Sequence, residues 1–360
     1  MSDSIISTSP KRNRCLAHGA VCMGNVLFGA GNVVAQIGLG GINPIVFAFI
    51  REGFSGPLLF FAGLLLLPRG SMRVGREDVC RMIAAGLSVF GMNFFYIMGV
   101  KLAGSSTAAI WQPAQPIIAT CLAVMLRLEH ATCLKVLGIV VACTGCVVYS
   151  VLDADDGGAP STALEGNAAL LLQGFSGSCF YIAQKPLLKK YATICVLAYS
   201  YFTATAVMGV IAVAVNNTPA LLDFICKDCE GDGWRVTSDA IFGIAYWVVI
   251  GSMISYTLIA WGNKHIDISC VTVYAVVQPV ATTAVAIMVI AMTAAPHYGL
   301  RGFAMSDLCA LVIFAGLGLV LQDSYAAVKL SLLEGEGPAS VLASSVVVTD
   351  PNYATLSFCA

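Results

Sequence analysis

The amino-acid sequence predicts an all-α integral membrane protein with ten transmembrane helices, built as two inverted repeats of five helices. Three observations predict this class: the scarcity of charged side chains, the length of the apolar runs, and the similarity between the two halves. Of the 360 residues, 58% are hydrophobic and only 11% are charged, and the mean hydropathy is +0.84. Soluble domains carry roughly 25% charged residues, so this composition favours a chain surrounded by lipid.

Ten apolar runs are long enough to cross about 30 Å of hydrocarbon, which takes roughly 20 residues of helix. The runs are approximately Ala17–Ile37, Asn43–Leu67, Val79–Val100, Ser105–Leu126, Cys133–Leu152, Ala168–Pro186, Val196–Val215, Ala240–Gly262, Ile268–Ala291 and Met305–Gln322. The residues before the first run are mostly polar, and no cleavage site follows a short apolar core. We therefore expect the first helix to be retained rather than removed as a signal peptide.

These runs divide the chain into five parts. We predict a cytoplasmic N-terminal segment at 1–16, a first repeat of helices one to five at 17–152, an acidic outer linker at 153–167, a second repeat of helices six to ten at 168–325, and a flexible cytoplasmic tail at 326–360. The tail is polar and lacks helical periodicity, which is typical of a segment that cannot bury an apolar face.

The lysine and arginine residues predict the side on which each loop lies, because short cytoplasmic loops carry an excess of positive charge. With ten spans and an inner N terminus, fourteen of the nineteen basic residues lie inside. Lys101, Lys227, Arg235 and Arg301 lie outside, and Arg51 lies within a span. Both termini are therefore expected to be cytoplasmic, in a multi-pass protein of the plasma membrane or an endomembrane.

An internal repeat without gaps appears at an offset of 163 residues, where "MGVKLAGSSTAAIWQPAQPIIATCLAV" aligns with "WGNKHIDISCVTVYAVVQPVATTAVAI". Seven of the 27 positions are identical, including Lys101 with Lys264 and Gln115-Pro116 with Gln278-Pro279. Because five helices is an odd number, the second half must enter the membrane in the opposite orientation. Inverted repeats are typical of secondary transporters, whose substrate site lies near the midplane between the halves.

The repeated prolines predict interruptions in helices four and nine. Pro116 and Pro279 each remove a backbone hydrogen bond and free a carbonyl group, and Gln115 and Gln278 place amides beside them. Pro113 adds another proline one turn before Pro116. Such helices are typical of a cavity wall, although packing kinks with glutamines bonded to neighbouring helices are the alternative.

Polar side chains inside the predicted spans are the candidates for a substrate-binding lining. Asn25, Asn32 and Gln36 are spaced by seven and four residues, so they share one face of helix one. The other candidates are Asn93, Tyr96, Trp111, Gln112, Gln115, Tyr181, Gln184, Tyr256, Tyr274 and Gln278. Neutral groups of this kind suit zwitterionic or weakly acidic amphiphiles, because multiply charged substrates require more buried Arg and Lys. Interhelical hydrogen bonds are the structural alternative for each of them.

Two charged residues, Arg51 and Glu52, lie inside the second span and are candidates for ion coupling or charge recognition. An Arg at the bilayer centre costs about 2.5–3.5 kcal/mol on insertion scales, so Arg51 needs a partner, either a substrate carboxylate or protein carbonyls. Adjacent helical side chains do not face each other, so we expect each residue to have a partner of its own. Glu52 is the best candidate for binding a proton, because burial favours the neutral acid.

The stretches "GGINPIVFAFIRE", "STAAIWQPAQPIIATCLAVMLRLE" and "SCFYIAQKPLLKKY" resemble helices two, four and six of EamA-type carriers of the drug/metabolite transporter superfamily, nearest the plant nodulin-like, Walls Are Thin related branch. The resemblance extends over roughly residues 17–325. It implies two inverted EamA repeats, cytoplasmic termini, and transport of amino acids, auxin-like acids or other small metabolites. It also places Arg51 on the family's basic residue of helix two and "RLE", Arg127–Glu129, at the inner end of helix four.

We therefore predict a secondary transporter of small organic metabolites that works by alternating access and is not an enzyme. No catalytic or nucleotide-binding motif occurs in the right context, and we expect no cofactor and no metal. The expected partners are a small-molecule substrate and the lipid bilayer, with no nucleic acid, and a homodimer stays open. A nucleotide-sugar or phosphate-ester antiporter, using Arg51, Lys101 and Lys264, is one alternative, and a receptor or scaffold without transport is another.

Two cysteines differ from the others, most of which lie in or beside apolar runs as small hydrophobic residues. Cys226 and Cys229 lie in the acidic loop "CKDCEGDGW", which the predicted topology puts outside. A disulfide could persist on that side of the membrane. A pair of free thiols, a loop disulfide and half of a zinc site all remain open from the sequence.

Overall fold

The computed structural model describes residues 10–38, 42–103, 108, 111–112, 114–129, 132–153, 163–226, 229, 231–293 and 308–333. These residues form helices and contain no strand. The first half contains α1 (Pro10–Gly38), α2 (Pro44–Leu66), η1 (Arg76–Asp78), α3 (Val79–Ala103), α5 (Ala114–Met125) and α6 (Cys133–Asp153). The second half contains α7 (Ala163–Lys190), α8 (Thr193–Asn216), α9 (Pro219–Ile225), α10 (Ser238–Tyr246), η3 (Trp247–Ser255), α11 (Tyr256–His265), α12 (Ile268–Val273), η4 (Tyr274–Val276), α13 (Val277–Thr293) and α14 (Ala310–Leu333).

The all-helical, membrane-type class is confirmed, since several helices are long and apolar enough to cross a bilayer. Five described stretches meet both conditions: Pro44–Leu66, Arg76–Ala103, Thr193–Asn216, Ala240–His265 and Ile268–Met292. Three shorter apolar helices accompany them, at Ala114–Met125, Cys133–Gly145 and Leu311–Asp323. Each predicted apolar run coincides with one or more helices, but ten membrane crossings stay a prediction.

Two of the helices, α1 and α7, are 29 and 28 residues long, and polar side chains are spread along both of them. The second begins at Ala163, inside the stretch predicted as a linker, and continues past Pro186 to Lys190. The predicted boundaries of this helix were therefore too short at both ends, because hydropathy reports the apolar centre of a helix and not its polar ends.

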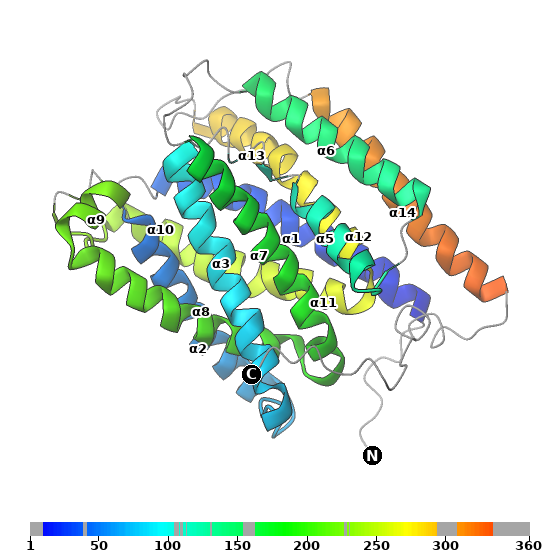
Figure 1. The fold of residues 1–360 in the computed structure, drawn as a ribbon, viewed down its shortest axis with the longest axis horizontal. Helices are drawn as coiled ribbons and strands as arrows, with labels where there is room; N and C mark the ends of the chain where they lie inside the picture. The colour runs from blue at the N-terminus through cyan, green and yellow to red at the C-terminus, as the bar shows by residue number, and fades with distance from the viewer. Residues whose placement is uncertain are drawn as a thin grey trace.

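The helices pack in pairs that are reciprocal between the two halves. Figure 1 shows α3 beside α7 and α6 beside α14, and α2 contacts α8. An inverted repeat relates α1 to α7, α2 to α8, α3 to the helix formed by α10, η3 and α11, α5 to the helix formed by α12, η4 and α13, and α6 to α14. Under this exchange, the contact of α1 with α13 corresponds to that of α7 with α5. The contact of α1 with α11 corresponds to that of α7 with α3. The pairs α2–α8, α5–α12 and α6–α14 correspond to themselves.

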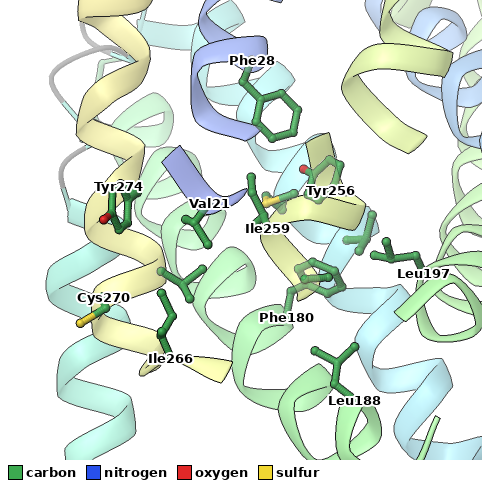
Figure 2. Close-up of a cluster of buried hydrophobic side chains, with 14 of the residues drawn as sticks. Val21, Phe28, Phe180, Leu188, Leu197, Tyr256, Ile259, Ile266, Cys270 and Tyr274 are labelled. Carbon is green, nitrogen blue, oxygen red and sulfur yellow. The ribbon is translucent and has the colours of Figure 1, made fainter. Parts of the chain in front are cut away.

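The centre of the bundle is an aromatic and aliphatic core that draws on both halves (Figure 2). Phe28 of α1 meets Tyr256 of α11 edge to face at a centroid distance of 5.0 Å. Phe180 of α7 meets the same ring at 6.3 Å. Edge-to-face pairs stabilise beyond their buried area, so this core fixes the positions of three helices that belong to different halves.

Close backbone contacts occur at equivalent positions of α1 and α7. A Cβ atom on Gly29 would lie 2.6 Å from the Cβ of Ala281 and 2.7 Å from the carbonyl oxygen of Gln278, and a Cβ on Gly177 would lie 2.6 Å from the Nε2 of Gln115. Gly29 and Gly177 are 148 residues apart in the chain. Small residues at such positions let membrane helices approach closely.

We expect Gly29→Ala to destabilise the purified protein, because the added methyl group must push α13 away from α1. Overpacking typically costs about 1–3 kcal/mol, so the melting temperature in detergent should fall by several degrees. Gly19→Ala is the matched control on the same helix, since a Cβ there meets nothing within 4 Å. Equal melting temperatures for the two variants would contradict the tight packing of α1 on α13.

Candidate functional site

A buried pair of opposite charges lies on α2. The Nη2 atom of Arg51 is 3.5 Å from the Oε1 atom of Glu52, and the two side chains are 9% and 0% exposed. The expectation that these neighbours would not pair was wrong. The Cβ atoms of adjacent helical residues diverge, but the long stem of Arg51 lets its guanidinium bend back to the carboxylate.

Glu52 also has a partner on α3. The Nδ2 atom of Asn93 donates to Oε1 of Glu52 at 2.5 Å, so both contacts use the same carboxylate oxygen. The Oε2 atom of Glu52 and the Nε atom of Arg51 are buried, and neither has a hydrogen-bond partner among the described residues. Buried charged groups normally have all their hydrogen bonds satisfied, so the two open positions are where water or a ligand is expected.

Aromatic rings cover the guanidinium of Arg51. Its Cζ atom lies 6.0 Å from the ring centroid of Phe47 and 5.8 Å from that of Trp247. Both distances lie within the range of cation–π attraction. Because the two rings come from α2 and η3, Arg51 connects the first half to the second. We refer to Arg51, Glu52, Asn93 and Trp247 as the Arg51–Glu52 cluster.

The helix that carries Trp247 has π-type hydrogen bonding from Trp247 to Ser255. It is attached to both neighbouring helices through its carbonyl groups: Ser55 of α2 donates to the oxygen of Val248 at 3.5 Å, and Tyr201 of α8 donates to that of Ser252 at 3.2 Å. Single π turns are rare and occur frequently at functional sites. This one holds an aromatic side chain over the buried arginine.

Tyrosine rings extend the cluster toward the core. Tyr201 and Tyr256 both interact electrostatically with Arg51 and Glu52, and their ring centroids are 6.1 Å apart. Of the two, only Tyr256 was a sequence candidate. Tyr201 could have been noticed as a hydroxyl inside an apolar run, but no spacing linked it to helix two.

Three amide candidates lie between α1 and α13. The Nε2 atom of Gln278 donates to Oδ1 of Asn25 at 2.8 Å, and the Nδ2 atom of Asn32 donates to Oγ1 of Thr282 at 3.2 Å. The side chain of the fourth amide, Gln36, lies outside the described residues. In this structure, Asn25, Asn32 and Gln278 join two helices, which is the structural alternative for such groups.

The helix that contains Pro279 is interrupted directly before it. The turn η4 (Tyr274–Val276) separates α12 from α13 and has 3-10 geometry. The proline ring would clash with the carbonyl group four residues earlier, at Ala275, and it has no N–H to donate. In the first half, Gln112 lies in a turn and α5 begins at Ala114. These positions align with the second-half turn at the offset of 163 residues.

Of the first-half candidates at this turn, Pro113 lies outside the described residues. Pro116 is buried within the first turns of α5. Gln115 is buried as well, and its amide occupies the space beside Gly177 of α7. The glutamine therefore faces the contact between α5 and α7.

Two aromatic candidates are bonded to other side chains. The indole Nε1 of Trp111 donates to Oδ1 of Asn167 at 2.7 Å, which links helix four to the start of α7. The hydroxyl group of Tyr274 is 3.2 Å from Nδ1 of His18 on α1. Both contacts join helices of different halves.

The remaining candidates differ in their surroundings. Gln184 is fully buried, and neither atom of its amide is bonded within the described structure. Tyr181 is half-buried, and its carbonyl oxygen accepts from Asn263 at 2.9 Å. Gln112 is half-buried, and Tyr96 is 41% exposed.

A second group of charges lies where α5 ends and α12 begins. Glu129 accepts from the backbone N–H of Ile268 at 2.5 Å, from that of Ser269 at 3.3 Å, and from the Ser269 hydroxyl. The Nζ atom of Lys135 lies 3.6 Å from Glu129 and 3.4 Å from Asp267. We call Glu129, Lys135, Asp267 and Ser269 the α5–α12 ion cluster.

Other polar contacts surround this cluster. Lys185 of α7 donates to the carbonyl oxygen of Ile266 at 2.9 Å, and Thr132 donates to Asp323 of α14 at 2.6 Å. Although burial raises the pKa of Asp267, the ammonium groups of Lys135 and Lys185 outweigh it and hold that pKa below its usual value. Asp267 therefore stays charged at neutral pH, and its ionic contacts contribute stability that is lost only as the pH falls through this lowered pKa.

Sequence reasoning assigned no role to this cluster. Glu129 was named only as part of the stretch Arg127–Glu129 in the family resemblance, and hydropathy treats Lys135 and Asp267 as ordinary loop charges. The repeat alignment aligns Ser106 with Ser269, but it contains no information about which acid contacts the latter. Only the fold brings the end of α5 in the first repeat against the start of α12 in the second.

The loop cysteines Cys226 and Cys229 form a disulfide, which decides between the alternatives that the sequence left open. Among the described residues, no group of three or more histidine, cysteine, aspartate or glutamate side chains could hold a metal ion.

Comparison with known proteins gives a family and a fold. Residues 16–151 match the EamA-like transporter family. A solved structure titled "Crystal structure of protein" has a TM-score of 0.68 and 16% sequence identity, over 88% of this chain and 99% of that chain. An identity this low shows a shared fold and no more. The family match covers less than half of the chain, and it suggests a membrane transporter of the drug/metabolite transporter superfamily.

Proposed function

We propose that the protein is a secondary transporter that moves a small organic metabolite across its membrane by alternating access. The observation that carries the proposal is the Arg51–Glu52 cluster, because ionisable side chains within a membrane span are costly and mark substrate or ion pathways. In the cluster, α2 and α3 of the first half meet η3 of the second, and Glu52 and Arg51 each keep one polar atom without a partner among the described residues.

An inverted repeat is the architecture that we propose for this mechanism. The reciprocal helix contacts and the interruptions at equivalent positions of helices four and nine both support it. In carriers of this plan, one half rearranges against the other around a fixed site near the midplane. Ten crossings with both termini in the cytoplasm follow from the loop charges.

The proposed substrates are amino acids, auxin-like acids or other weakly acidic amphiphiles. Aromatic rings and one arginine can hold a single carboxylate and an apolar body, whereas nucleotide sugars require several cations. Lys101 is exposed and Lys264 is half-buried, and neither makes a described ion pair with the cluster. This arrangement favours the first substrate class over the phosphate-ester alternative, and the similarity to the nodulin-like branch stays a prediction.

The test is uptake by proteoliposomes of a labelled panel of amino acids, indole acids and nucleotide sugars, with and without a pH gradient. Saturable flux of an amino acid or indole acid is the expected result. Flux of nucleotide sugars alone would favour the antiporter. A receptor would be favoured by two results together. A folded preparation would show no flux of any labelled compound, and deletion of the tail after Lys329 would abolish the function of the protein.

A further inference from the structure

We propose that the α5–α12 ion cluster is a one-sided latch that keeps the cytoplasmic end of the carrier closed at rest, with Glu129 as its positioning residue. The inference rests on the proposed function, because it names the group that regulates access to the same site. The inference concerns which end of the carrier is closed in the resting conformation, and it does not depend on the identity of the substrate.

The latch joins the two halves at the place where a motion would separate them. Glu129 follows α5 of the first repeat, and its carboxylate accepts from two backbone N–H groups and the serine hydroxyl at the start of α12. Lys135 bridges Glu129 to Asp267 from α6. Bonds to ionised groups are roughly twice as strong as neutral ones, so separating α5 from α12 removes several strong contacts together.

The latch also restrains the interrupted helix. α12 has only six residues between Asp267 and the 3-10 turn η4, which leads directly to Pro279. A short helix held at its first turn by a carboxylate cannot tilt about the interruption while that contact lasts. Release of Glu129 therefore frees the segment that forms one side of the break.

The charges of the latch are absent from the other repeat. At the offset of 163 residues, Asp267 corresponds to Gly104, and Glu129, if the alignment is extended without a gap, corresponds to Met292. Met292 is 78% exposed. Only the serine is shared, as Ser106 and Ser269. An inverted pair of repeats places equivalent positions at opposite ends of the bundle. Among the residues that the structure describes, the ionic closure of α5 on α12 therefore lies at one end.

Loop charges put the latched end in the cytoplasm. The resting carrier is consequently closed toward the cytoplasm, and breaking the latch shifts the population toward the conformation that is open there. A ligand that binds from the outer side then has a lower apparent affinity, because apparent affinity falls with the fraction of competent protein.

Alkylation of a native thiol tests the latch without any substrate. Cys270 follows Ser269 on α12 and is 0% exposed, and Cys195 on α8 is equally buried and serves as an internal control. The full-length protein is placed in inside-out and right-side-out vesicles, treated with a membrane-impermeant maleimide, and analysed by mass spectrometry. We expect Glu129→Gln to raise the rate at Cys270 about tenfold in inside-out vesicles only, and to leave Cys195 unchanged.

Ser269→Ala is the milder second variant, and it should raise the rate at Cys270 by a smaller factor. Unchanged rates at Cys270 in both variants would overturn the latch. A parallel rise at Cys195 would also overturn it, since Glu129 would then support the whole fold. Reaction from right-side-out vesicles alone would overturn the assigned side. None of these outcomes depends on flux, so they are distinct from failure of the transport panel.

Discussion

Arg51→Gln is expected to reduce transport at least a hundredfold while the protein still reaches the membrane. The substitution leaves Glu52 as a buried carboxylate without a cation, because the amide of Asn93 supplies no charge. Removing one partner of a buried ion pair costs about 3–5 kcal/mol. The expected loss of flux assumes that this cost falls on the transporting conformation, where each 1.4 kcal/mol corresponds to a tenfold change in population. Flux of the substrate identified by the panel, per mole of reconstituted protein, is the measurement.

Two matched variants sharpen this prediction. Arg51→Lys keeps the charge but loses the planar group that lies over Phe47 and Trp247, so we expect it to restore little of the flux. Lys101→Gln removes a cation that is exposed, and flux should stay within about twofold of the wild type, since an exposed charge contributes little. Full flux in Arg51→Lys would mean that only the charge of residue 51 is needed for transport. Near-normal flux in Arg51→Gln would show that transport does not depend on the Arg51–Glu52 cluster.

The sequence could predict the helices, the position of the interruption and the buried charges, because each leaves a local signal. Apolar length marks the helices, Pro279 marks the break near Ala275, and a charge inside an apolar run marks Arg51 and Glu52. These signals depend on neighbours in the chain, within one or two turns of helix. These features can therefore be predicted from the sequence without knowledge of the fold.

The contacts of the site could not be predicted, because they depend on which helix faces which. Asn25 and Asn32 fit a polar lining by their spacing, and Gln278 fits it by the repeated Gln-Pro pair, yet hydrogen bonds between α1 and α13 engage all three. Asn93 and Trp247 reach the charged pair from α3 and η3. The π segment that positions Trp247 contains Gly251-Ser252, and the hydroxyl group of Tyr201 on α8 donates to the carbonyl oxygen of Ser252.

Glu52→Gln should abolish the stimulation of transport by a pH gradient and leave slower flux that is independent of the gradient. Glutamine keeps an oxygen that can accept from Asn93, but it cannot exchange a proton in the transport range of pH. Initial rates with and without the gradient, at matched substrate concentration, measure the effect. A gradient response retained in Glu52→Gln would show that another group carries the proton, and the absence of any response in the wild type would show facilitated diffusion or exchange.

A paired substitution separates this coupling role from a purely structural one. Arg51→Met and Glu52→Met each leave an unpaired buried charge, whereas the double variant leaves none. Because an apolar replacement of a whole buried ion pair is often neutral or stabilising, the double variant should melt at a higher temperature than either single variant. If it recovers stability but not gradient-driven flux, the charges are kept for transport. If it recovers both, the pair holds the helices together and the proton path lies elsewhere.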